Sequence, residues 1–70
     1  MRDLIDGYFK LRSDSEGLKQ AGSRFEGLFW RHEGDKAVRE SDGWRLSVYR
    51  CEGQIEACVK SPDGTFSTYS

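Results

Sequence analysis

The chain has 70 residues, with 11 basic and 12 acidic side chains, a formal net charge of −1 and 13% aromatic residues. Its length predicts one small α+β domain over residues 1–70, and its rings and balanced charge argue against disorder. The balance also argues against strong non-specific nucleic-acid binding, which needs many phosphate contacts. No apolar run approaches the roughly 18 residues of a membrane span, and the charged start is unlike a signal peptide. We therefore expect a cytoplasmic protein without membrane contact.

The first predicted element is a helix over residues 3–12. Asp3 is suited to cap its start, where a carboxylate also interacts favourably with the helix dipole. Gly7 is unfavourable there, by about 1 kcal/mol relative to alanine. One apolar stripe at helical spacing is formed by Leu4, Ile5, Tyr8, Phe9 and Leu11. This pattern predicts an amphipathic helix.

A second, shorter helical turn is predicted over residues 17–21. Ser13 and Glu16 have the S-x-x-E spacing of a capping box, which marks a helix start. Gly22 follows the turn and is suited to end it. The N-terminal third of the chain is therefore predicted to be mainly helical.

Residues 23–33 are compatible with either helix or strand. Ser23 and Glu26 repeat the S-x-x-E spacing, and Phe29 would join an apolar helical stripe. The ring-rich run 28–31, followed by a turn-like sequence at 32–35, favours a strand and hairpin instead. The sequence therefore leaves both alternatives, helix and strand, open for residues 23–33.

The C-terminal half has the pattern of an antiparallel meander. Turn sequences recur about ten residues apart, at Asp42-Gly43, Glu52-Gly53 and Pro62-Asp63-Gly64. The predicted strands between and beside them are residues 36–40, 44–51, 54–60 and 65–69. The fold class is therefore α+β, with the N-terminal helical segment packed on one face of a meander of three to five strands. The polar 65–69 segment is a candidate sheet edge, and the oligomeric state stays open.

A two-residue Glu52-Gly53 loop would fix the register of the central hairpin. Cys51 would then face Gln54, and Val48 would face Ala57. One face would be apolar and would pack on the helix: Trp44, Leu46, Val48, Ile55, Ala57 and Val59. The other would point outward: Arg45, Ser47, Tyr49, Cys51, Gln54, Glu56, Cys58 and Lys60. A slip by one residue would mix these faces, which a half-buried sheet resists.

The sequence offers little that suggests catalysis. Cys51 and Cys58 would lie about 13 Å apart along the ladder, whereas a disulfide needs Cα atoms within about 7 Å, so we predict free thiols. His32 is the single histidine, and no metal-ligand spacing accompanies it. No glycine-rich nucleotide motif is present. We therefore expect a non-enzymatic protein without metal or cofactor.

The candidate binding residues lie in two places. Arg45 and Lys60 would face each other on the outward sheet face, with Tyr49 beside them, and could hold an anionic group. Trp30 and Arg31 have the composition of an interface hot spot, although packing of Trp30 against the sheet edge is the alternative.

These residues lead to two functional interpretations. The first is a small binding or regulatory protein that docks on a larger protein partner, of the accessory or inhibitor type that phages or plasmids encode. The alternative is a weak nucleic-acid-binding module that uses the outward basic and aromatic face.

Overall fold

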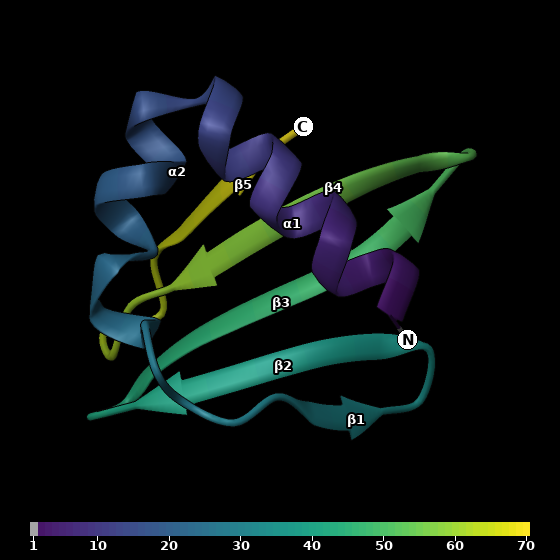
Figure 1. The fold of residues 1–70 in the computed structure, drawn as a ribbon. Helices are drawn as coiled ribbons and strands as arrows, with labels where there is room; N and C mark the ends of the chain where they lie inside the picture. The colour runs from purple at the N-terminus through teal and green to yellow at the C-terminus, as the bar shows by residue number, and fades with distance from the viewer. Residues whose placement is uncertain (1) are drawn as a thin grey trace.

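The structure is a computed structural model that describes residues 2–70, and it places a helical layer on one face of a five-stranded antiparallel sheet (Figure 1). The helical elements are α1 (Arg2–Asp14), α2 (Glu16–Ala21) and the 3-10 turn η1 (Ser23–Phe25). The strands are β1 (Arg31–Glu33), β2 (Lys36–Ser41), β3 (Trp44–Cys51), β4 (Gln54–Lys60) and β5 (Phe66–Tyr69). They pair in the order β1-β2-β3-β4-β5, so β1 and β5 form the edges. The predicted α+β meander is confirmed, with five strands.

The predicted register of the central hairpin is also confirmed. Val48 pairs with Ala57 and Cys51 with Gln54. The two loop residues, Glu52 and Gly53, have φ angles of 51° and 80°. Two successive positive φ values belong to a type I′ turn, whose twist matches that of the flanking strands. The turn therefore fixes which strand residues face the helices.

The core lies between α1 and the inward face of the sheet. Tyr8 of α1, Leu18 of α2 and Phe25 of η1 are almost completely buried, and they pack with Leu46 and Val48 of β3. Both helices, the 3-10 turn and the sheet thus contribute large side chains to the same core.

Gly7 allows α1 to pack closely on the sheet. A Cβ atom at this position would lie 2.6 Å from Ile55 Cγ1 of β4. That separation is far below the ordinary contact distance of about 3.5–4.0 Å between carbon atoms. Gly7 weakens the helix locally, but the close contact between α1 and β4 leaves no room for a Cβ atom at this position.

The structure resolves the ambiguity at residues 23–33 in favour of a short turn followed by a strand. Helix continues only through η1; Gly27 then takes a φ of 79°, and the chain is extended into β1. Arg39 of β2 donates a hydrogen bond to the Phe25 carbonyl at 3.1 Å, which ties the end of η1 to the sheet. Of the two alternatives left open for this segment, the helical one is wrong beyond η1, and Phe29 is 97% exposed instead of joining the core.

The start of α2 also differs from the prediction. Helix α1 continues to Asp14, so Ser13 is helical and does not cap α2. Ser15 is the N-cap: its backbone is extended, and its hydroxyl accepts a 3.2 Å hydrogen bond from the Leu18 N–H. Gly22 ends α2 as predicted. Across residues 2–70, no helix combines the length and apolar character needed to cross a membrane.

Candidate functional site

The outward face of the sheet carries no helix, and its residues form rows across the strands (Figure 1). The register gives three rows: Glu33-Lys36-Tyr49-Glu56, Arg31-Val38-Ser47-Cys58-Thr68 and Glu40-Arg45-Lys60-Phe66. Antiparallel neighbours in one row point to the same side of the sheet. Charged and aromatic side chains from all five strands therefore share this open surface.

A hollow of about 280 Å³ lies on this surface, and we call it the outer hollow. Its lining consists of Lys36, Arg45, Ser47, Tyr49, Cys58, Lys60 and Phe66. The Lys36 Nζ atom lies 5.7 Å from the Tyr49 ring centroid, and the Lys60 Nζ atom lies 5.5 Å from that of Phe66. Both distances are within the range of cation–π attraction. The outer hollow therefore presents two rings, each with an ammonium group above it.

Four charged side chains form a network beside the outer hollow, which we call the charge network. Arg45 pairs with Glu33 and, at 2.9 Å, with Glu40; Arg31 pairs with the same two carboxylates at 3.2 and 2.9 Å. Arg45 and Lys60 do face each other as predicted. The carboxylates of β1 and β2 compensate the expected repulsion between these two cations.

The charge network also explains an apolar residue on the open face. Val38 points outward in the register, opposite Ser47 and Arg31, yet it is completely buried. Its register partner Arg31 has a long aliphatic stem, and such stems commonly cover apolar surface. Loss of hydration raises the pKa of Glu33, but hydrogen bonds and charge from Arg45 and Arg31 outweigh this and lower it overall. Glu33 therefore stays ionised within the charge network.

The two lysines of the outer hollow contrast with its arginine. Within residues 2–70, neither Lys36 nor Lys60 forms an ion pair, whereas Arg45 forms ion pairs with both Glu33 and Glu40. Burial raises the pKa of Tyr49, and the nearby Cys58 and Glu56 add to the effect, so its phenol stays protonated. The outer hollow thus offers two unneutralised ammonium groups and a neutral phenol.

The structure brings together three of the five predicted binding residues. Arg45, Tyr49 and Lys60 line the outer hollow, and Arg31 lies beside it in the charge network. Trp30 does not belong to this surface. Its ring packs edge-on against Tyr8 of α1 at 5.4 Å and lies under the Arg39 guanidinium of β2 at 4.2 Å, so it contacts both the helical layer and the sheet.

Sequence reasoning missed two residues of the outer hollow. Lys36 lies opposite Tyr49 in the β2–β3 register, which the Asp42-Gly43 turn would have predicted had the pairing been extended to that hairpin. Phe66 is 64% exposed and lies opposite Lys60. It belongs to the 65–69 segment, whose polar residues predict a sheet edge. The two rings of this segment, Phe66 and Tyr69, are three residues apart and so do not follow the period of two of a strand.

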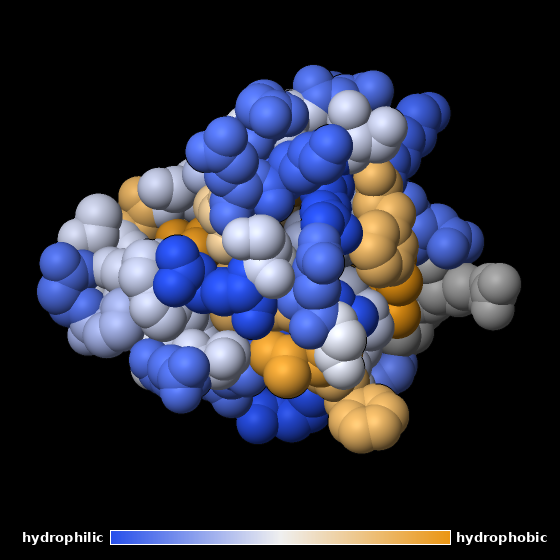
Figure 2. All heavy atoms as spheres, turned by 60° about the vertical axis from the view of Figure 1, so that its left-hand side comes forward, coloured by the Kyte–Doolittle hydropathy of each residue, from blue (hydrophilic) through white to orange (hydrophobic). Residues whose placement is uncertain are grey.

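Apolar side chains do not form one continuous surface in the space-filling view. Figure 2 shows them as separate patches among hydrophilic ones. Among the side chains that the structure describes, the most exposed large apolar ones are Phe9 in α1, Phe29 between η1 and β1, and Phe66 in β5.

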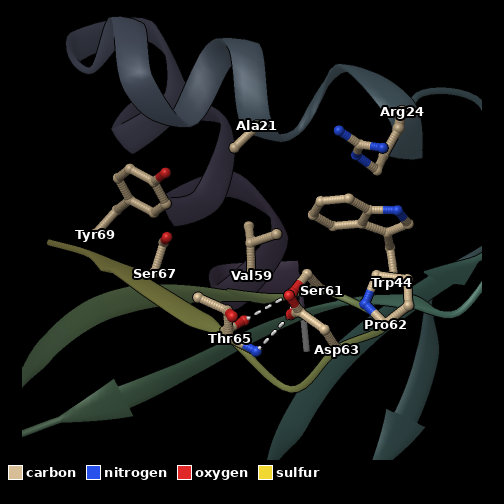
Figure 3. A pocket seen from close by; sticks show the side chains of 10 residues that line it. All are labelled: Ala21, Arg24, Trp44, Val59, Ser61, Pro62, Asp63, Thr65, Ser67 and Tyr69. Carbon is tan, nitrogen blue, oxygen red and sulfur yellow. Dashed lines mark hydrogen bonds between the residues drawn. The ribbon is translucent and has the colours of Figure 1, made fainter.

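A second and larger hollow lies on the inward side of the sheet, below α2 and η1, and we call it the Trp44 cavity (Figure 3). Its volume is about 580 Å³. Its lining consists of Ala21, Arg24, Trp44, Val59, Ser61, Pro62, Asp63, Thr65, Ser67 and Tyr69. The two hollows are on opposite faces, because Trp44 and Arg45 are neighbours in β3 and point in opposite directions.

The thiols and the histidine form no reactive cluster. Cys51 and Cys58 are free, as predicted, and His32 lies exposed on the edge strand β1. No three metal-ligating side chains of His, Cys, Asp or Glu gather anywhere in the described part of the chain.

Comparisons with known proteins add no assignment: no protein family, curated protein or solved structure matches this chain.

Proposed function

We propose that the protein is a small non-enzymatic binding protein that docks on a larger protein through the outer hollow. The observation that carries this proposal is the presence of two ring-and-ammonium units on the open face, Lys36 with the half-buried Tyr49 and Lys60 with the exposed Phe66. Tyrosine is enriched at interface hot spots, and cation–π attraction favours an ammonium group close to each ring. The partner surface that fits would present an Asp or Glu side chain between apolar groups. Such docking suits an accessory or inhibitor protein.

The charge network favours a protein partner over nucleic acid. Nucleic-acid affinity depends on cations that are free to contact phosphates. Arg45 and Arg31 are each held by two carboxylates, and Glu56 is the fourth residue in the row of Tyr49. The same surface therefore carries acidic groups that would repel a phosphate backbone. A protein surface with one acidic side chain avoids this repulsion.

The test is a selection of random linear peptides displayed on phage against the intact chain. We expect enrichment of peptides in which Asp or Glu adjoins an aromatic or aliphatic residue. The double variant Lys36→Glu/Lys60→Glu should lose these peptides. Lys10→Glu/Lys19→Glu is the matched control, since both lysines are exposed on the helical layer, and it should retain them. Equal enrichment on both variants, or peptides without acidic residues, would refute the proposal.

The nucleic-acid alternative is distinguished by salt. If the protein were a nucleic-acid-binding module, fluorescence anisotropy with a labelled single-stranded oligonucleotide would show binding. The affinity would fall steeply between low and physiological salt, as counterion release requires. Loss of that binding in Arg45→Ala and Lys60→Ala would favour the alternative. We expect no saturable binding at physiological salt.

A further inference from the structure

The Trp44 cavity has the size and the walls of a small-molecule site. Its volume of about 580 Å³ lies within the usual range of about 300–1,000 Å³ for such sites. The rings of Trp44 and Tyr69 project from either side of Val59, which forms an apolar floor between them (Figure 3). An aromatic ring placed on Val59 would meet an aromatic wall on each side.

Arg24 differs from the other arginines whose side chains the structure describes. Four of them form ion pairs, namely Arg12, Arg31, Arg45 and Arg50, and Arg39 donates to a carbonyl group. Arg24 has neither kind of partner among the described residues. Its guanidinium lies flat over the Trp44 indole, with its central carbon 3.6 Å from the ring centroid (Figure 3). This contact places the guanidinium of the exposed Arg24 among the residues that line the cavity.

The acidic residue of the lining does not neutralise this cation. Asp63 accepts hydrogen bonds from the Ser61 hydroxyl and, at 3.0 Å, from the Thr65 N–H (Figure 3). Both bonds go to its Oδ1 atom and lie within the loop between β4 and β5. The cavity therefore combines an apolar surface with one guanidinium group that forms no ion pair among the described residues.

We propose that the Trp44 cavity binds a small aromatic carboxylate. The ring of the ligand lies on Val59 between Trp44 and Tyr69, and its carboxylate accepts two parallel hydrogen bonds from Arg24. Bidentate pairing of this kind combines charge with a defined direction, which a lysine would not supply. The site is separate from the outer hollow, since it opens on the other face of the sheet.

The probe for this proposal is 4-phenylbutyrate, titrated into the ¹⁵N-labelled chain and followed by two-dimensional NMR. We expect saturable shifts of the Trp44 indole N–H and of the Ser67 and Tyr69 amide signals. The uncharged analogue 4-phenylbutyramide keeps the ring and loses the charge. It should bind about tenfold more weakly, since a charge-assisted hydrogen bond contributes at least that factor.

Two arginine variants separate the site from general charge effects. Arg24→Gln should weaken 4-phenylbutyrate binding about tenfold. Arg50→Gln also removes one positive charge, but Arg50 lies near the other end of β3, about 20 Å from Trp44 by strand rise. This variant should leave the affinity for 4-phenylbutyrate unchanged. The proposal is overturned if the acid and the amide bind equally, if Arg24→Gln binds as tightly as the wild type, or if no saturable shift occurs at the cavity.

Discussion

Gly7 is the residue at which local preference and packing conflict most directly. We expect Gly7→Ala to lower the free energy of unfolding by about 1–3 kcal/mol, the usual cost of overpacking, although alanine is the better helix former. The reason is the 2.6 Å approach of the new Cβ atom to Ile55 Cγ1. Urea denaturation measures the change.

The double variant Gly7→Ala/Ile55→Ala tests whether Ile55 is the cause. In the Ile55→Ala background the added methyl group meets no Cγ atoms, so the cost of Gly7→Ala should shrink. If Gly7→Ala stabilises the protein, α1 does not lie as close to β4 as described.

Asp63 makes the free energy of unfolding depend on pH in the acidic range. Hydrogen bonds from Ser61 and Thr65 lower the pKa of its carboxyl from 3.8 to about 2. Because the folded pKa is depressed, the ionised carboxylate stabilises the fold above about pH 4. This contribution is lost as the pH falls through 2. The stability difference between the wild type and Asp63→Asn, measured by denaturant midpoints, should be constant above pH 4 and should narrow below it. A difference that does not change between pH 5 and pH 2 would contradict this assignment.

At the scale of elements, the start of α2 depends on Ser15. Its hydroxyl satisfies the Leu18 N–H, which the helix itself leaves without a partner. Ser15→Ala should therefore cost about 1 kcal/mol, the usual value for a lost N-cap. Ser13→Ala is the matched control, because Ser13 lies within α1 and alanine is at least as good a helix former there. Thermal unfolding followed by circular dichroism compares the two, and an equal loss in both would reject Ser15 as the cap.

The elements also show which parts of the fold local sequence determines. Strands β3 and β4 were predicted with their observed bounds, because a two-residue turn and alternating side chains specify both length and register. The segment 23–33 contains cap-like, helical and strand-like patterns at once. Its structure depends on contacts with β2, above all the Arg39 hydrogen bond to Phe25. No pattern within the segment contains that information.

The candidate site was predictable only where it depends on the β3–β4 hairpin. The facing of Arg45 and Lys60 with Tyr49 followed from the β3–β4 register. The pairing of Arg45 with Glu33 did not, because it requires β1, whose existence the sequence left undecided. Of the two facing cations expected from β3 and β4, Arg45 is therefore neutralised by carboxylates of β1 and β2, whereas Lys60, among the described residues, is not.

At the scale of the whole molecule, the helices and the sheet depend on one core. Phe25 is completely buried between the helical layer and the sheet. Phe25→Ala should cost about 3–5 kcal/mol, a large part of the total stability of a chain of this length. We expect circular dichroism and tryptophan fluorescence to lose their native signals at the same, lower denaturant concentration. Separate transitions for the two probes would show that the layers unfold independently.

The meander order has a kinetic consequence. Every strand pairs with its neighbour in the chain, so each hairpin closes only a short loop, and the β3–β4 hairpin with its tight turn is the natural nucleus. Helix α1, in contrast, packs on β3 and β4 from the far end of the sequence. We expect the sheet to assemble early and α1 to dock late, so that substitutions in the hairpin slow folding while those at the α1 contact mainly accelerate unfolding.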